Sequence, residues 1–144
     1  MNVFGINAFH GDSSAVLLRD GRLASAVEEE RFNRTKHWAG FPVRAAGACL
    51  DNERVEHVGV SRDPRAHLWR KALRVALRPS YWGKAGKRAR NLLRVADLGA
   101  GLGLNRTAQI HFIEHHRAHL ASAFFPSPFE EAAVVSVDGF GDFS

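Results

Sequence analysis

The apolar positions in the first part of the chain fall into short runs separated by turn residues. Runs of about four to eight apolar residues with such borders predict strands. They occupy residues 2–9, 15–18 and 23–27. Asp20-Gly21, between the second and third runs, is typical of a tight hairpin turn. The opening segment therefore predicts a strand, a loop, and a hairpin of two further strands.

The spacing of apolar residues changes to a helical period in the segment that follows. This period predicts a helix over 42–54, and strand-like runs come next at 55–61 and 109–113. Residues 117–125 again have a helical pattern, and the apolar run at 132–137 predicts a last strand. Strands that alternate with helices predict an α/β fold, a mixed sheet with flanking helices.

Charge changes this picture in the middle of the chain. The chain has 20 Lys or Arg against 15 Asp or Glu, a formal net charge of +5. Residues 62–94 hold eleven of the bases and one acid, so this segment is +10 and the rest of the chain is −5. Apolar residues at helical spacing over 68–77 and 87–98 predict two helices with packed faces. We expect a basic helical insertion over 62–104.

The basic insertion has two interpretations. A solvated basic face is the favoured one, since charge runs on helices are usually exposed to water. The alternative is a surface for nucleic acid or another anionic partner. Aromatic residues are few there and stand at packing positions, so a stacking platform for single strands is not indicated, and nucleic acid is disfavoured as a partner.

Composition limits the number of domains, the cellular compartment and the possible association with membranes. Hydrophobic residues make up 45% of the chain, enough for one core, and the length suits one domain over 1–144. Cys49 is the single cysteine, so an internal disulfide is impossible and a reducing cytoplasm is the simplest compartment. The apolar runs are shorter than the about 18 residues of a membrane span, and the first residues do not resemble a signal peptide. We expect a cytoplasmic protein without a membrane partner.

Three side chains with metal-ligand chemistry follow the predicted strand at 109–113. His115 and His119 are four residues apart, so on a helix they share one face about one turn apart. That spacing alone is a weak signal, because most such pairs are exposed or hydrogen-bonded histidines. Asp138 follows the run at 132–137 and begins Asp-Gly-x-Gly, where backbone can approach a phosphate or a metal. Two histidines and one aspartate make a candidate three-ligand set with open positions.

Three motifs in this order resemble a known family. They are Gly5-Ile6-Asn7-Ala8-Phe9-His10-Gly11-Asp12-Ser13-Ser14-Ala15, then Glu28-Glu29-Glu30-Arg31-Phe32-Asn33-Arg34-Thr35-Lys36-His37, and then Glu114-His115-His116-Arg117-Ala118-His119 with Val137-Asp138-Gly139-Phe140-Gly141. The sequence resembles the N-terminal part of the O-carbamoyltransferase family of antibiotic and nodulation-factor biosynthesis. That family is related to the tRNA threonylcarbamoyl-transfer protein and to the actin-like sugar kinases. The resemblance implies an actin-like fold, of which this chain would hold the first half.

The resemblance also implies a reaction. A carbamoyl group would pass from carbamoyl adenylate to a hydroxyl of a small-molecule or natural-product acceptor. The donor would be made from carbamoyl phosphate and ATP, with Mg²⁺, in a domain that this chain lacks. Such enzymes are several times longer, so we expect further C-terminal domains or a partner chain, and no activity from these 144 residues alone.

Individual residues acquire roles from the same resemblance. His10 would position or deprotonate the acceptor hydroxyl, as an imidazole can near neutral pH. His115, His119 and Asp138 would hold iron, although zinc or manganese would suit the same ligands. The residues expected to bind the substrate or nucleotide are Asp12, Ser13, Arg34, Lys36, Gly139 and Gly141. Without the resemblance, the first loop would be a turn stabilised by its own side chains, and the charged segment a solvated cluster.

Two other functions remain open at this point. The first is a non-catalytic half domain that binds nucleotide or another protein. The second is phosphoryl transfer from ATP, as in the actin-like kinases. His115 and His119 argue against the second, because kinases of that fold use Mg²⁺, which prefers oxygen ligands.

Overall fold

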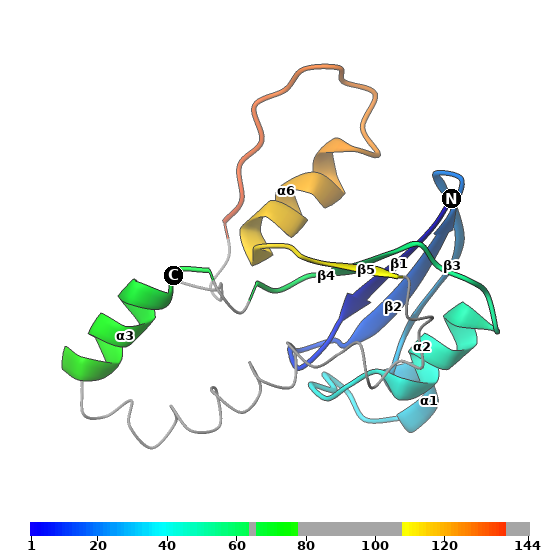
Figure 1. Ribbon diagram of the computed structural model, residues 1–144, viewed down its shortest axis with the longest axis horizontal. Helices are drawn as coiled ribbons and strands as arrows, with labels where there is room; N and C mark the ends of the chain where they lie inside the picture. The colour runs from blue at the N-terminus through cyan, green and yellow to red at the C-terminus, as the bar shows by residue number, and fades with distance from the viewer. Residues whose placement is uncertain (64–65, 78–107, 138–144) are drawn as a thin grey trace.

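The computed structural model describes residues 1–63, 66–77 and 108–137 (Figure 1). The helix predicted at 87–98 lies outside them, as do Asp138, Gly139 and Gly141. Within the described residues the protein is an α/β structure built on one five-stranded mixed sheet in the order β3-β2-β1-β4-β5. The elements in chain order are β1 Asn2–Asn7, β2 Ser14–Arg19, β3 Arg22–Glu28, α1 Glu30–Asn33, α2 Val43–Leu50, β4 His57–Val60, α3 Leu68–Leu77, β5 Gln109–Phe112 and α6 His115–Phe124.

The first three strands form an antiparallel meander, as the sequence predicts. β1 pairs with β2 from Asn2 opposite Arg19 to Asn7 opposite Ser14, and β2 pairs with β3. Asp20 and Gly21 connect β2 to β3 with φ angles of 48° and 76°. Two successive left-handed residues are what a tight turn needs to match the twist of its strands. The predicted hairpin is confirmed.

The later strands are parallel to β1. The chain leaves β3, passes through α2 and returns as β4, which pairs with β1 in parallel, and β5 pairs with β4 in the same sense. The carboxyl ends of β1, β4 and β5 therefore meet at one edge of the sheet. In open α/β sheets this edge is where ligands bind.

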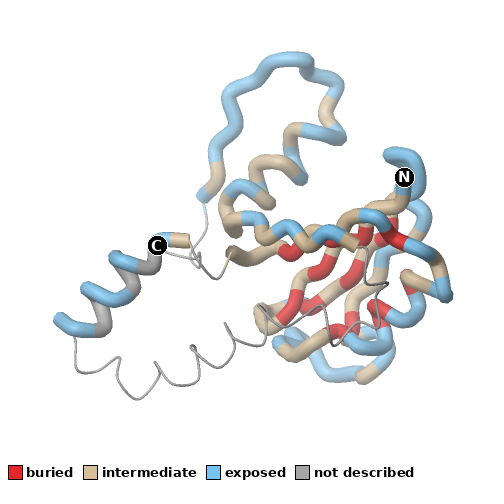
Figure 2. The backbone as a smooth tube through the Cα atoms, viewed as in Figure 1, coloured by how far each residue is buried: buried red, intermediate tan, exposed pale blue. Residues whose placement is uncertain are grey.

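The core lies on one face of the sheet, where α2 covers it (Figure 2). Every second residue of β1, β2 and β4 points to this face, and Phe4, Leu17 and Val58 are at most 1% exposed. Helix α2 contributes small apolar side chains, among them the buried free thiol of Cys49. Glu29 is buried beside the helix, and its carboxylate accepts the backbone N–H of Ala45 at 2.8 Å. This bond satisfies a donor that the first turn of α2 would otherwise leave unpaired.

Several predictions of local structure need correction. Helix α2 ends at Leu50 and not at residue 54, because Asp51 and Asn52 adopt left-handed φ angles of 36° and 63°. The strand predicted at 132–137 is wrong: these residues are irregular, and Val137 is 94% exposed. An apolar run predicts burial, but a strand also needs a neighbouring edge with which to pair.

The apolar face expected at 68–77 does not form part of the described core. Helix α3 is present, but Leu73 and Leu77 are 50% and 70% exposed. Helical spacing determines which residues share a face and leaves open what that face contacts. No helix among the described residues combines the length and apolar character that crossing a membrane requires.

Candidate functional site

Two loops meet at the carboxyl edge of the sheet: the first-strand loop, residues 8–13, and the charged loop, residues 34–42. They carry parts of the first two motifs. Backbone hydrogen bonds connect them: the N–H of Phe9 donates to Gly40 O, and the N–H of Ser13 donates to Trp38 O, both at 3.0 Å. Ser13 is 1% exposed, and its hydroxyl lies 3.0 Å from His10 O and 2.8 Å from Gly40 O. The first-strand loop and the charged loop therefore form one surface, and Ser13 holds them together from within.

The rim of this surface contains an exposed contact between a carboxylate and an imidazole. Asp12 Oδ1 lies 2.9 Å from His37 Nδ1, and the backbone N–H of His37 donates to Glu30 Oε2 at 3.2 Å. The side chains of Asp12 and His37 are 57% and 81% exposed, so water screens the pair and it adds little to stability. Its geometry nevertheless joins the two loops a second time.

Left-handed backbone is concentrated in the same loops. Phe9, Asp12, Arg34 and His37 have φ angles between 54° and 60°. Residues other than glycine adopt this region at a cost, and such residues often cluster at functional sites. Here the cost is offset by the hydrogen bonds between the loops, which hold both of them in one arrangement.

The cations of the charged loop are available to a ligand. Arg34 ends α1, where its backbone N–H donates to Glu30 O at 2.9 Å, and its side chain is exposed. Lys36 is exposed two residues later. A guanidinium can grip a phosphate through two hydrogen bonds, and an ammonium adds a mobile point charge. The loop therefore presents anion-binding groups at its surface.

Helix α6 begins at the carboxyl end of β5 and has a charged cap. Glu114 accepts the backbone N–H groups of His116 and Arg117 at 3.1 and 3.0 Å, and its carboxylate also lies 3.0 Å from His116 Nδ1. Burial alone would raise the pKa of Glu114, but these N–H groups outweigh that effect and lower the pKa. The carboxylate is therefore ionised at neutral pH, as a cap at the positive end of a helix requires.

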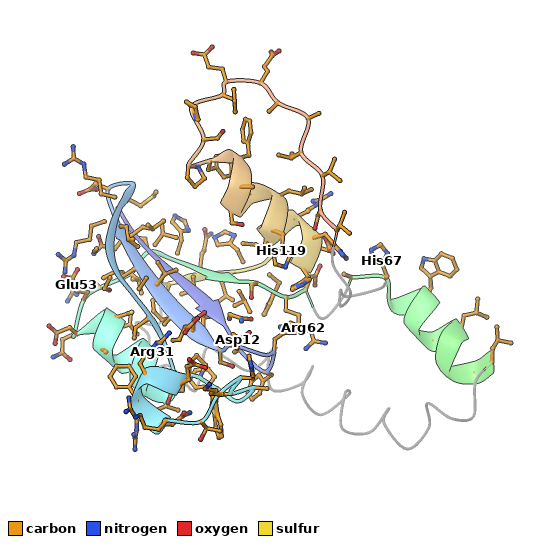
Figure 3. All side chains as sticks on the ribbon, turned by 180° about the vertical axis from the view of Figure 1, so that it is seen from behind. Asp12, Arg31, Glu53, Arg62, His67 and His119 are labelled. Atoms are coloured by element: carbon orange, nitrogen blue, oxygen red, sulfur yellow. The ribbon has the colours of Figure 1, made fainter. Side chains whose placement is uncertain are left out.

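The two histidines of the third motif lie together on α6, as their spacing predicts. His115 Nε2 and His119 Nε2 are 3.1 Å apart, and the ring planes are nearly perpendicular at 89°. His10 reaches the same place from the first loop, with its ring centroid 5.1 Å from that of His115. Figure 3 labels His119 on α6 and Asp12 on the first loop. Residues more than a hundred positions apart thus converge at one edge of the sheet.

The α6 pair fits a transition metal. Two nitrogens that bind one ion at about 2.0–2.1 Å are separated by about 3.0–3.4 Å, and the observed 3.1 Å lies in this range. Across the residues that the structure describes, no set of three or more His, Cys, Asp or Glu side chains converges on one metal position. The third predicted ligand, Asp138, lies outside these residues. The described part thus supplies two imidazoles.

An open trough runs along the sheet face opposite α2 and has a volume of about 720 Å³. Gly5 and Gly59 form part of its floor, and Ile113 and Ala118 line it from the α6 side. A Cβ at Gly5 would lie 2.6 Å from Val16 Cγ1, so a larger residue there would require Val16 to shift. Arg31 also lines the trough, which places the second motif beside it.

Sequence reasoning missed three polar residues at this edge. Ser61 Oγ donates to Asn7 Oδ1 at 3.0 Å, which ties the end of β4 to the end of β1. Asn7 Nδ2 lies 3.1 Å from both Gly11 O and Asp12 O, and Arg62 Nη1 lies 3.5 Å from Phe9 O. The signal that could have found them is positional: each stands where a parallel strand ends.

Comparison with known proteins agrees with the motifs. A family model described as Carbamoyltransferase N-terminus matches residues 61–144. The nodulation protein NolNO of Sinorhizobium fredii is 35% identical over 147 residues, covering 96% of this chain and 21% of its own length. An uncharacterized protein of Synechocystis is 35% identical over 162 residues, covering 99% of this chain and 26% of its own. The chain thus spans about a quarter or less of the length of these relatives.

Proposed function

The chain belongs to the carbamoyltransferase N-terminal family, and on that premise we propose that it helps to transfer a carbamoyl group from carbamoyl adenylate to a hydroxyl of a small-molecule acceptor. The observation that carries the proposal is the contact between His10 and His115. It brings a residue of the first motif beside the histidine pair of the third. An acceptor hydroxyl placed there would be within reach of an imidazole and of a metal held by α6.

The donor would bind along the joined loops. Arg34 and Lys36 supply cations for the adenylate phosphate, and Asp12 lies on the same rim. Ser13 would act from beneath, by holding the loops in the shape that the phosphate meets. Gly139 and Gly141 are proposed to complete the phosphate-binding backbone. Carbamoyl phosphate, ATP and Mg²⁺ would be used in further domains or in a partner chain.

The metal would be held by His115 and His119, with Asp138 as the proposed third ligand. We take iron as the first candidate, and another divalent transition metal as the alternative, because imidazole and carboxylate ligands suit several of them. When bound, such an ion would polarise an oxygen of the donor and stabilise the charge that develops on it. Glu114 fixes the helix turn that presents both imidazoles.

His10 is the proposed general base. The acceptor oxygen would form a bond to the carbamoyl carbon, and the bond between that carbon and the adenylate phosphate oxygen would break. AMP leaves with the bonding electrons, and the hydroxyl proton moves to a ring nitrogen of His10. Proton transfer of this kind contributes about 10²–10⁴-fold to rates.

The strand arrangement supports an actin-like fold. A three-stranded antiparallel meander, followed by crossovers to β4 and β5 in parallel with β1, agrees with the opening of that fold. The buried free thiol of Cys49 agrees with a reducing compartment, which supports the proposal of a cytoplasmic protein. The backbone thus supports the proposed fold, and the thiol supports the proposed compartment.

The test is a transfer assay with the full-length protein. Carbamoyl phosphate labelled with ¹⁴C is supplied with ATP, Mg²⁺ and a panel of hydroxyl-bearing acceptors, and the label in the acceptor is measured together with AMP. The proposal predicts acceptor-dependent label and one AMP for each group transferred. Nucleotide binding without any labelled product would favour the alternative, a non-catalytic nucleotide-binding or interaction half domain.

A further inference from the structure

A second pair of histidines stands on the sheet, outside the candidate site. His57 is the first residue of β4, and His111 is the third residue of β5. His57 Nδ1 lies 3.1 Å from His111 Nε2, and the ring centroids are 5.2 Å apart. The two residues are 54 positions apart in sequence, so the parallel register of β4 and β5 brings them together.

The sheet geometry explains why the rings meet. His57 is opposite Gln109, and Gly59 is opposite His111, so the two histidines are diagonal neighbours on one face. Gly59 has no side chain to occupy the space beside His111. The alternate residues of β4, Val58 and Val60, are completely buried on the other face and anchor the strand. The imidazoles therefore stand on a rigid backbone, which is the arrangement that favours a preformed binding site.

We propose that His57 and His111 form a binding site for a borderline divalent transition metal, such as Cu²⁺, Ni²⁺ or Zn²⁺. Imidazole nitrogen is a preferred ligand of these ions. The separation of 3.1 Å is the same as that of the α6 pair and lies in the range of about 3.0–3.4 Å for two nitrogens on one ion. The same two nitrogens are also within hydrogen-bond distance of each other.

The proposed site has room to complete its coordination. His57 is half-buried and His111 is exposed, so water can reach an ion held between them. Gln109 stands opposite His57 on the same face and is exposed, and its amide oxygen is a further donor within this part of the sheet. With two imidazoles the site binds less tightly than a three-ligand centre. Its effect is to fasten β5, the outermost strand of the described sheet on this side, to the anchored β4.

The experiment uses Cu²⁺, the divalent ion of highest affinity in this series. The full-length protein carries His115→Ala and His119→Ala, so that the α6 pair does not contribute. Copper is titrated, and electron paramagnetic resonance counts the coordinated nitrogens. The proposal predicts one equivalent of copper with a two-nitrogen signal. Either His57→Gln or His111→Gln should weaken binding by at least about tenfold and remove that signal.

The matched control is His67→Asn, which removes an exposed histidine at a left-handed position that asparagine tolerates. It should change copper affinity by less than about twofold. Circular dichroism checks that each variant keeps its sheet. If His57→Gln does not fold, His111→Gln serves instead, because His111 is exposed on the outermost described strand. If neither sheet variant weakens binding more than the His67 control does, the proposal is overturned and the contact is a hydrogen bond alone.

Discussion

Two pairs of histidines in this protein have ring nitrogens 3.1 Å apart, yet they are assembled in different ways. The α6 pair, His115 and His119, is one helical turn long and follows from a sequence spacing of four. The sheet pair, His57 and His111, depends on the register of two parallel strands. The first pair can be predicted from the sequence, whereas the second can be identified only from the fold.

The surroundings of the two pairs separate their proposed roles. The α6 pair stands at the carboxyl edge of the sheet, where His10 and the two joined loops also arrive. The sheet pair stands on β4 and β5 themselves, with Gln109 opposite His57. Metal binding alone is therefore proposed for the sheet pair. Catalysis is proposed for the α6 pair, because groups that could bind a substrate lie beside it.

The largest expected effect comes from breaking the α6 pair. His119→Ala should remove the metal proposed for that site and lower carbamoyl transfer by about 10³-fold, because the ion would supply several kcal/mol of charge stabilisation. Metal analysis and the ¹⁴C assay measure the two effects. His67→Asn is the control and should leave both values unchanged.

In the same His119→Ala variant, the sheet pair should still bind copper. This outcome would show that the two pairs are independent. Full transfer activity in a variant that has lost its metal would remove the ion from the proposed mechanism.

The next largest effect should come from changing His10, which lies beside the α6 pair. His10→Asn should lower transfer by about 10²-fold, because asparagine cannot accept the hydroxyl proton. Metal content should stay at the level of the unchanged protein, because His10 is not proposed as a ligand. The rate is followed against pH in both proteins, and the variant should lose the rise that deprotonation of a base produces. Transfer at the normal rate would exclude His10 as the base.

A smaller effect should follow from loosening the helix that holds the α6 pair. Glu114→Ala removes the acceptor of two backbone N–H groups and should lower the free energy of unfolding by about 1 kcal/mol. Denaturant unfolding at neutral pH measures the loss. Glu114→Gln, which keeps one acceptor oxygen, should lose less. Equal stability of all three proteins would show that the cap contributes nothing to α6.

The smallest effect should come from a substitution that changes stability and lies away from both histidine pairs. Gly47 lies within α2, and apart from its chain neighbours and the backbone of that helix, a Cβ there would meet no atom within 4 Å. Gly47→Ala should therefore raise the free energy of unfolding by about 0.5–1 kcal/mol, since alanine loses less backbone entropy in a helix. Thermal unfolding measures the gain. Copper affinity at the sheet pair should not change. If it rose together with the free energy of unfolding, copper binding would depend on the overall stability of the protein.

Much of the fold could be predicted from the sequence because local signals determine it. The Asp20-Gly21 turn and the helix from His115 onward are both determined by residues close together in sequence. The strand expected at 132–137 failed because strand formation depends on a partner elsewhere. For the same reason the sheet pair could not be found: nothing local to His57 indicates which strand will lie beside it.

The candidate site was predicted in part. The motifs named His10 and His115, and the structure brings their rings to 5.1 Å. The buried position of Ser13 could not be foreseen, because the two carbonyl oxygens near its hydroxyl come from separate loops. The supporting role of Asn7 depends likewise on the end of β4 lying beside it.

If α6 holds a metal beside His10, anomalous X-ray scattering will locate the ion. Crystals of the full-length protein, isolated without added metal, would be measured above and below the iron absorption edge. We expect a peak within about 2.0–2.3 Å of Nε2 of both His115 and His119. A peak at another transition-metal edge in the same position would change the ion and keep the site. If protein that transfers carbamoyl groups gives no anomalous peak at these histidines, then α6 does not hold a catalytic metal.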